Sequence, residues 1–259
     1  MKVKKNMKIT LIAGARPNFM KVAPIIKAIK KAYPQPLPKG KGDRLGEPIS
    51  YRLVHTGQHY DKNMSDTFFE ELGIPTPDVN LGCGGGTQAE QTAAIMVAFE
   101  KELMAHPADI VLVVGDVTST MACSIVAKKL NTKVCHVEAG IRSWDLTMPE
   151  EINRMVTDSL ADYMFTTSEV ANRNLRRQGA YPQPLPEGMG EKPTPDGERP
   201  CQRYWFVGNV MIDTLLANRV RFRKPDVWDE LQLREKEYIV MTMHRPANVD
   251  EENHLRAMM

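Results

Sequence analysis

The chain has 259 residues, of which 42% are hydrophobic and 25% are charged, and these proportions are ordinary for a globular protein. The formal net charge of +2 gives no broad electrostatic basis for nucleic-acid binding, so any anion must be bound by a local cluster. No stretch approaches the roughly 20 apolar residues of a membrane helix, so no membrane partner is expected. The first apolar run, Ile9–Ala15, ends at Arg16 and predicts a strand, not a signal peptide.

Apolar runs and helical patterns alternate along the first part of the chain. A buried strand is predicted at Ile9–Ala13, followed by a helix over Phe19–Ala32 with Asn18 as its N-cap. The next predicted elements are a strand at Tyr51–His55, helices at Asn63–Leu72 and Gln88–Ala105, a strand at Ile110–Val114, a helix at Ser119–Leu130, a strand at Lys133–Val137, a helix at Glu150–Ala161 and a strand at Tyr163–Thr166. This alternation predicts an α/β fold with a mostly parallel sheet.

A domain boundary is predicted near Ser168, which gives an N-terminal domain of residues 1–168 and a second unit of residues 169–259. The second unit is expected to contain helices at Ala171–Gln178 and Val210–Val220, strands at Tyr204–Val207 and Tyr238–Met243, and a final helix. A sheet of two strands cannot bury its faces well, so we expect this domain to be truncated or completed from elsewhere.

Two segments stand apart by composition. The heptapeptide AYPQPLP occurs at residues 32–38 and again at 180–186, and both copies run into stretches rich in proline, glycine and charge. We expect surface loop insertions, with a polyproline segment that binds a partner as the alternative. The cysteines are also scattered, without a C-x-x-C pair, which favours reduced and packed thiols in a cytoplasmic protein: Cys83, Cys123, Cys135 and Cys201.

Three acidic positions follow predicted strands or begin a predicted helix. Asp116 and Glu138 come directly after buried strands, and parallel sheets bind ligands beyond the carboxyl ends of their strands. Glu150, or its neighbour Glu151, can enter the same crevice from a helix N-terminus. Several carboxylates in one cleft separate their pKa values, so that one can act as an acid beside another that acts as a base.

Each of these acids also has a structural interpretation. Asp116 suits a turn or an N-cap, and Thr147–Glu150 fits a T-x-x-E capping box. His136 and Glu138 lie two residues apart on one strand, which predicts that their side chains point the same way. The His-x-Glu pattern can indicate a zinc deaminase, but its partner P-C-x-x-C is absent, so no metal is expected.

Basic residues lie at matching places. Arg16 and Lys21 follow the first strand, Arg142 follows Glu138, and His244 with Arg245 follows the strand predicted at Tyr238. His244 is either a packed histidine or a proton donor or phosphate contact. No P-loop or dinucleotide fingerprint is present, so the sequence gives no sign of a nucleotide cofactor.

Seven motifs, taken in order, resemble the non-hydrolysing UDP-N-acetylglucosamine 2-epimerases. They are GARPNFMK at residues 14–21, TGQH at 56–59, GD at 115–116, HVEAGIR at 136–142, PEEINR at 149–154, GNVMID at 208–213 and HRP at 244–246. The resemblance covers nearly the whole chain apart from the two proline-rich insertions. It implies two Rossmann-like domains of the glycosyltransferase-B type with the substrate between them, and no cofactor.

The resemblance also implies a reaction. The family inverts C2 of UDP-GlcNAc to give UDP-ManNAc, a precursor of cell-surface polysaccharides, through anti elimination of UDP and its re-addition to a 2-acetamidoglucal. The residues that match the family's catalytic positions are Asp116, Glu138, Glu150 and His244, with Glu151 as the neighbouring alternative. The residues that match substrate-binding positions are Arg16, Lys21, Gln58, His59, Arg142, Asn209 and Arg245. The family also implies a homodimer.

Three departures from the family pattern limit these expectations. The second domain of the family normally continues well beyond Met259 and supplies a Ser/Gly-rich loop and a glutamate that hold UDP, so we expect this chain to be inactive or very weak. Val117 replaces the threonine that commonly follows Gly-Asp. No arginine occurs between Arg52 and Arg142, which argues against activation by a second UDP-GlcNAc. The rival interpretations are a glycosyltransferase of the same fold and a non-catalytic remnant or binding subunit.

Overall fold

The structure, a computed structural model, describes residues 6–32, 49–57, 73–179, 181–182, 203–242 and 251–258. The chain divides into two compact units, Met1–Asn218 and Arg219–Met259. Some predicted features lie outside the described residues: the helix at Asn63–Leu72, Cys201, and both AYPQPLP repeats except for Ala32 of the first and Tyr181–Pro182 of the second.

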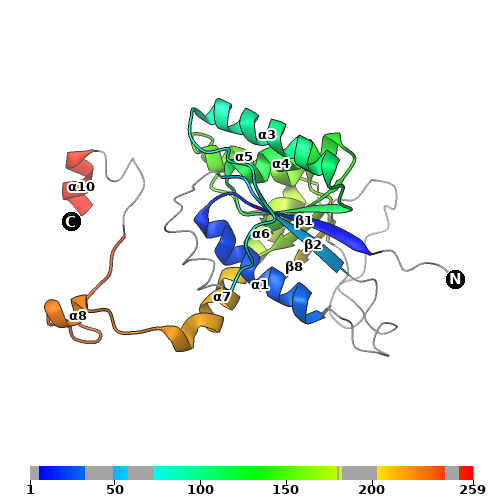
Figure 1. Ribbon diagram of the computed structural model, residues 1–259. Coiled ribbons are helices and arrows are strands. Elements are labelled where there is room, and N and C mark those ends of the chain that lie inside the picture. Colours follow the sequence, from blue (N-terminus) through cyan, green and yellow to red (C-terminus); the bar gives the residue numbers. More distant parts are fainter. Residues whose placement is uncertain are drawn as a thin grey trace. The chain divides into compact units, whose positions relative to one another are not determined.

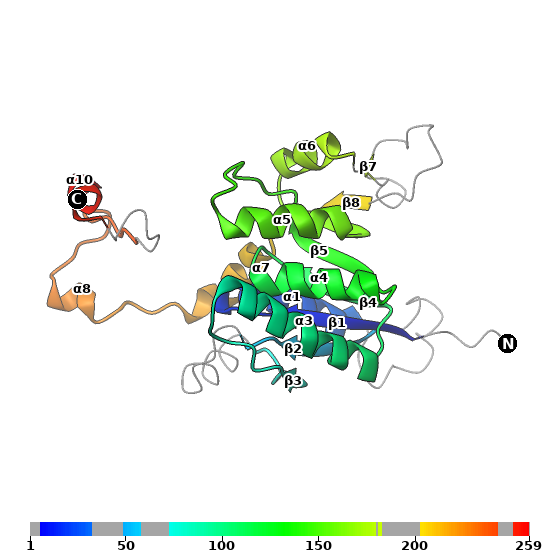
Figure 2. The ribbon, with the colours of Figure 1, turned by 90° about the horizontal axis from the view of Figure 1, so that it is seen from above.

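One parallel sheet organises the first unit. Its eight strands run in the order β3-β2-β1-β4-β5-β6-β8-β7, and every neighbouring pair is parallel. Figure 2 follows this order across the sheet. The strands are β1 (Met7–Ala13), β2 (Ile49–His55), β3 (Val79–Asn80), β4 (Ile110–Val114), β5 (Lys133–Ala139), β6 (Tyr163–Thr166), β7 (Tyr181–Pro182) and β8 (Arg203–Phe206). The predicted α/β class with a parallel sheet is confirmed.

Helices cover both faces of this sheet (Figure 1). One face carries α1 (Arg16–Ala32) and α7 (Val210–Asn218), and the other carries α3 (Gln88–Ala105), α4 (Thr118–Lys129) and α5 (Pro149–Leu160). The short helix α6 (Glu169–Arg177) packs with this second group through Leu175. The sheet is therefore the middle layer of a helix–sheet–helix arrangement, which explains why its central strands read as continuous apolar runs.

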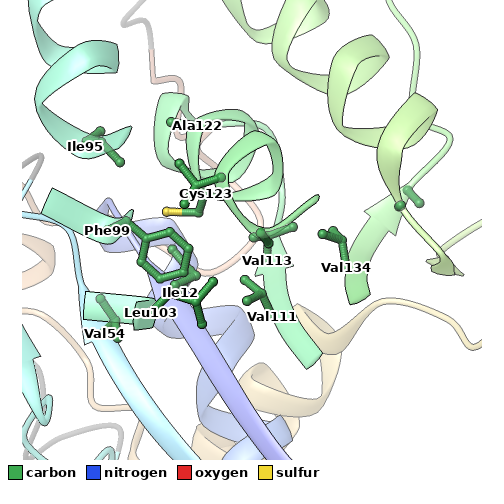
Figure 3. Packing of buried hydrophobic residues seen from close by; sticks show 14 of the residues in the cluster. Ile12, Val54, Ile95, Phe99, Leu103, Val111, Val113, Ala122, Cys123 and Val134 are labelled. Carbon is green, nitrogen blue, oxygen red and sulfur yellow. The ribbon is translucent and has the colours of Figure 1, made fainter. Parts of the chain in front are cut away.

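Each face has its own hydrophobic core, because successive strand residues point to opposite sides. On the α1 face, Phe19, Val22 and Ile26 pack on Leu11 and Val114. On the other face, α3 and α4 supply the larger part of the core shown in Figure 3, where the ring of Phe99 lies over the strands beside Cys123. Cys83, Cys123 and Cys135 are buried free thiols, as predicted for packed cysteines, and burial raises the pKa of Cys135 to about 12.

Helix boundaries agree with the predictions to within a few residues, whereas two of the predicted caps are wrong. The helix α5 begins after Met148, which makes no side-chain cap, and the Thr147 hydroxyl donates to Asp145 instead of closing a capping box. A capping box is instead present at α3, where Thr87 Oγ1 accepts from the Glu90 N–H and the Glu90 carboxylate accepts from the Thr87 N–H.

The end of the chain differs most from the predictions. The strand expected at Tyr204–Val207 is β8, which follows the predicted boundary at Ser168 and pairs with β6 in the same sheet. In the second unit, residues 238–242 form no strand in the described part, and Ile239 and Val240 are 94% and 76% exposed. This unit contains only short elements in the described residues: η1 (Arg219–Arg221), α8 (Val227–Glu230) and α10 (Glu252–Met258). Among the described residues, no helix is long and apolar enough to cross a membrane.

Candidate active site

The site is built at the carboxyl ends of β1, β4 and β5, where parallel sheets place their ligand sites. Asn18 joins the first two of these ends. Its Oδ1 accepts from the N–H groups of Gly14 and Ala15 at 3.0 and 2.9 Å, and its Nδ2 donates to the carbonyl of Val114 at 3.0 Å. Since α1 already begins at Arg16, Asn18 is not the predicted N-cap but a buried brace between two strand ends.

The Glu138 carboxylate forms an ion pair with Lys21 and not with His136. Its Oε2 lies 2.5 Å from Lys21 Nζ of α1, and the two side chains are only 9% and 10% exposed. Glu138 has a φ of 72°, and the pairing register of β5 with β6 shifts between Val137 and Ala139. The prediction that His136 and Glu138 point the same way is therefore wrong, because this bulge turns the carboxylate toward α1.

Gly115 packs directly against this ion pair. Its φ of +69° is readily adopted only by glycine, and a Cβ built there would lie 2.8 Å from Lys21 Nζ and 3.6 Å from Glu138 Oε2. The sequence predicted a Gly-Asp turn after β4, and the structure adds that the glycine lets the backbone approach the two charged groups closely.

Asp116 is the more open of the two strand-end acids, with 30% of its side chain exposed. Its Oδ2 forms an ion pair with Arg154 Nη2, and its carbonyl accepts from Asn153 Nδ2 at 2.9 Å. Asp116 is also not an N-cap, since Val117 occupies that position of α4. Asn153 and Arg154 therefore connect α5 to the end of β4. The sequence assigned these two residues no role beyond their place in the PEEINR motif.

Glu151 organises the loop that leads into α5. It has no exposed area, and its carboxylate accepts from the N–H groups of Ser143 and Trp144 at 2.9 and 3.2 Å and from Arg154 Nη1 at 2.9 Å. Burial alone would raise the pKa of Glu151, but these donors together lower it below its usual value. Glu151 is thus a structural carboxylate that holds Trp144 at a φ of 62°.

Glu150 is exposed on the first turn of α5 and makes no ion pair with any described residue. Neighbouring helix residues project about 100° apart, so only one of two consecutive glutamates can face the sheet, and Glu151 takes that position. Asn209 is half-buried before α7, and its Oδ1 accepts from the N–H of Met211 at 2.9 Å.

Three buried side chains, those of His136, Asp158 and Arg142, contact one another next to the Gly115–Asp116 peptide. His136 Nε2 is 2.8 Å from the carbonyl of Gly115, and His136 Nδ1 is 2.6 Å from Asp158 Oδ1 of α5. Asp158 Oδ2 accepts from the Gly140 N–H at 2.9 Å and pairs with Arg142 Nη2 at 2.7 Å. All three side chains have no exposed area. Arg142, predicted to bind substrate, is thus enclosed against Asp158 and Gln178 in this structure.

Several predicted site residues lie outside the described part of the chain: Gln58, His59, His244, Arg245 and the side chain of Arg16. The start of the TGQH motif is described. His55 ends β2 and stacks on Phe19 with 5.2 Å between ring centroids, and its Nδ1 accepts from the Gly57 N–H at 3.0 Å. Burial lowers the pKa of His55, opposed by a hydrogen bond with Asn80. Among the described residues, no group of three or more His, Cys, Asp or Glu could hold a metal ion.

Comparisons with known proteins agree on one family. The family described as UDP-N-acetylglucosamine 2-epimerase matches residues 44–259. A Methanococcus maripaludis protein named UDP-N-acetylglucosamine 2-epimerase homolog is 39% identical over 251 residues, which are 96% of this chain and 60% of that protein. A UDP-2,3-diacetamido-2,3-dideoxy-D-glucuronate 2-epimerase of Pseudomonas aeruginosa is 36% identical over 246 residues, 95% of this chain and 59% of that protein.

Solved structures give the same result. The Methanocaldococcus jannaschii UDP-GlcNAc 2-epimerase, crystallised with UDP-GlcNAc and UDP, superposes with a TM-score of 0.74 at 36% identity and covers 97% of this chain and 60% of its own. This likeness confirms the predicted glycosyltransferase-B-like epimerase fold over the matched part. The chain spans about 60% of the length of these relatives. The resemblance first seen in seven motifs is confirmed, and the chain belongs to the UDP-N-acetylglucosamine 2-epimerase family.

Proposed function

We propose that the site at the ends of β4 and β5 transfers protons at C2 of a UDP-2-acetamido sugar and so interconverts UDP-GlcNAc and UDP-ManNAc. In the first step a carboxylate removes the C2 proton while the bond between C1 and the UDP oxygen breaks, which gives 2-acetamidoglucal and UDP. In the second step UDP adds back to C1 and a proton is returned to C2 from the opposite face. The sugar atoms balance, and no external oxidant is needed.

The observation that carries this proposal is the pair of differently placed acids. Asp116 is partly exposed and held by Arg154, while Glu138 is buried and held by Lys21. Two carboxylates with separate cation partners can be kept in fixed positions around one carbon, as proton transfer at two faces requires. Glu150, exposed at the start of α5, is the third acid of the proposed set.

Cations at this edge of the sheet also suit a diphosphate leaving group, whose developing charge they would stabilise. Lys21 is the described cation nearest to Glu138, and we propose that it divides its charge between this carboxylate and the diphosphate. Arg16, Gln58, His59, His244, Arg245 and Asn209 stay proposed contacts by family resemblance, as do assembly as a homodimer and a role in polysaccharide precursor synthesis.

The relatives named above are epimerases of two different UDP sugars, a UDP-GlcNAc and a UDP-diacetamido uronate. We propose UDP-GlcNAc as the substrate, because the family and the M. jannaschii relative carry that name. The uronate is the second candidate, favoured by the 36% identity to the P. aeruginosa enzyme. Parallel assays with both sugars decide between them by the ratio of kcat/KM.

The decisive experiment measures solvent deuterium at C2. The chain is assayed at high concentration in ²H₂O with UDP-GlcNAc, beside a chimera in which it is followed by the part of the M. jannaschii epimerase that extends beyond the match. We expect the chimera to form UDP-ManNAc with deuterium at C2 in both sugars, and the chain alone to be far slower.

The controls are matched substitutions in the chimera. Asp116→Asn and Glu138→Gln should each slow deuterium exchange by about 10²–10⁴-fold, the usual contribution of a positioned acid or base. Asp162→Asn, at the other end of β5, should leave exchange unchanged. A chimera that is folded and binds UDP but never exchanges the C2 proton contradicts the proposal, and transfer of an intact sugar to an acceptor would favour a glycosyltransferase.

A further inference from the structure

His136 is a buried residue that the proposed reaction does not use directly, yet its two ring nitrogens face two acceptors. Nε2 lies 2.8 Å from the carbonyl oxygen of Gly115, which can only accept a hydrogen bond. Nδ1 lies 2.6 Å from Asp158 Oδ1. A neutral imidazole has one donor and one acceptor, so either neutral tautomer would place a lone pair against an oxygen.

A protonated Asp158 could donate to the imidazole and so remove this conflict, but the surroundings of Asp158 favour its ionised form. Burial alone would raise its pKa, and the contacts with His136 lower it. The Arg142 guanidinium and the Gly140 N–H lower it as well, and these two contributions do not depend on the state of the imidazole, so the pKa lies below its usual value. Its other oxygen already accepts from Gly140 and Arg142, at 2.9 and 2.7 Å. Asp158 is therefore an ionised acceptor, and both hydrogen bonds of the imidazole must be donated by His136.

We propose that His136 is held as an imidazolium and is a positioning residue that fixes the Gly115–Asp116 peptide, and with it the catalytic carboxylate of Asp116. The catalytic part of this inference rests on the proposed function, whereas the protonation of the ring does not. His136 donates to the carbonyl before Asp116, and Asn153 Nδ2 donates to the carbonyl of Asp116 itself at 2.9 Å. The backbone is thus clamped on both sides of this residue, and Arg154 holds its side chain.

The hydrogen bonds from His136 and Asn153 to these two carbonyls matter because a glycine such as Gly115 can adopt many backbone conformations. At a φ of +69° a glycine can leave its turn at little cost, so the hydrogen bond from His136 and the one from the Gly115 N–H to Val137 at 3.0 Å are what fix it. The charged groups around His136 are Asp158 of α5 and Arg142 of the loop after β5, with the Lys21–Glu138 pair on the far side of Gly115.

The first test reads the ring without any assay of activity. The chain is labelled with ¹⁵N-histidine, and the signals of His136 are assigned as those absent from His136→Asn. We expect two protonated ring nitrogens for His136, both protected from solvent exchange. A single ring N–H would overturn the assignment of the imidazolium, whatever the enzyme does.

The second test uses the active chimera described above. His136→Asn leaves one donor group for two acceptors, and we expect kcat to fall by about 10²-fold, the effect of a misplacement of roughly 1 Å, with KM almost unchanged. Asn153→Ala, a milder change on the second clamp, should also lower kcat without raising KM. Asp162→Asn removes a charge that contacts the opposite end of β5 and should lower stability but not kcat.

The outcomes separate the two proposals. A folded His136→Asn or Asn153→Ala chimera with an unchanged kcat overturns the positioning role while the epimerase function stands. A KM that rises as much as kcat falls also overturns it, because it indicates lost substrate binding. If the parent chimera shows no exchange, the proposed function fails, and the histidine spectrum still decides the state of the ring.

Discussion

Two aspartates contact opposite ends of β5 and have opposite surroundings. At the amino end, Asp162 accepts from the Val134 N–H at 2.8 Å and pairs with Lys128 at 2.9 Å, and both side chains of this pair are about one-third exposed. At the carboxyl end, Asp158 accepts from the Gly140 N–H and pairs with His136 and Arg142, and all three side chains have no exposed area.

The comparison shows that this fold buries charged groups at the carboxyl end of β5 and leaves them partly exposed at its amino end. An exposed ion pair contributes little and is screened by salt, whereas a buried one must offset the loss of hydration of each ion. A buried cluster is then strongly coupled, because the removal of one member leaves the others unpaired. The cluster lies beside Gly115 and Asp116, and in the proposal made above this coupling fixes the geometry of the site as well as the stability of the sheet.

The largest expected effect comes from Asp158→Asn. An asparagine is neutral and offers one acceptor oxygen, and its NH₂ group must face a donor, so the buried Arg142 guanidinium loses the counter-charge of Asp158. We expect a loss of about 3–5 kcal/mol in the free energy of unfolding, measured by urea denaturation. A neutral or stabilising effect with an unchanged m-value would contradict this view of the buried end.

Alanine at the two strand-end glycines should come next. Gly140 has a φ of +80°, and a Cβ there would lie 2.5 Å from the backbone oxygen of Ala171, whereas at Gly115 the nearest atom is the mobile tip of Lys21. Gly115→Ala should cost about 1–2 kcal/mol for its left-handed conformation, and Gly140→Ala should cost more because backbone must also move. Thermal unfolding of both variants gives the order, and the reverse order would refute the argument.

The dependence of the free energy of unfolding on pH in the acid range tests the comparison further. Since the pKa of Asp158 is lower in the folded than in the unfolded chain, the unfolded chain binds more protons between the two values, and stability rises with pH there. This contribution is complete above about pH 4, the unfolded value for an aspartate, and is lost as pH falls through the folded value. The stability difference between the parent and Asp158→Asn should therefore shrink in acid. A difference that stays constant down to pH 2 would count against the linkage.

The smallest effect is expected for Lys128→Ala at the amino end. This partly exposed ion pair should contribute at most about 1 kcal/mol, and less at high salt. Urea denaturation at low and high ionic strength measures it, with Asp158→Asn as the reference for a salt-insensitive loss. A Lys128→Ala loss as large as that of Asp158→Asn would remove the distinction between the two ends.

Much of the fold could be predicted because its signals are local. The apolar runs that end at Val114 and Val137 predicted two neighbouring parallel strands, and the rule for strand ends placed Asp116 and Glu138 at the same edge. The strand expected at Tyr238 is absent from the described residues 238–242, since an apolar run forms a strand only where a neighbour supplies hydrogen bonds.

The partners of the site residues could not be predicted. Lys21 and Glu138 are separated by 117 positions, and their contact depends on a bulge and a positive φ that no periodicity reveals. Asp158 reads in the sequence as one polar residue of an amphipathic helix, and only the packing of α5 on β5 places it against His136. The one available signal was the position of Arg154 and Asp158 on the same face of α5 as Glu151, at i+3 and i+7 from that residue.

The irregular register at the end of β5 has one more consequence. An unbroken strand would deliver positions 136 and 138 to the same layer of helices, where an imidazole and a carboxylate would compete for the same partners. The shift between Val137 and Ala139 instead gives His136 to α5 and Glu138 to α1. Two ionisable groups of one strand therefore have different partners, from helices on opposite faces of the sheet, and Gly115 is the residue that contacts both groups.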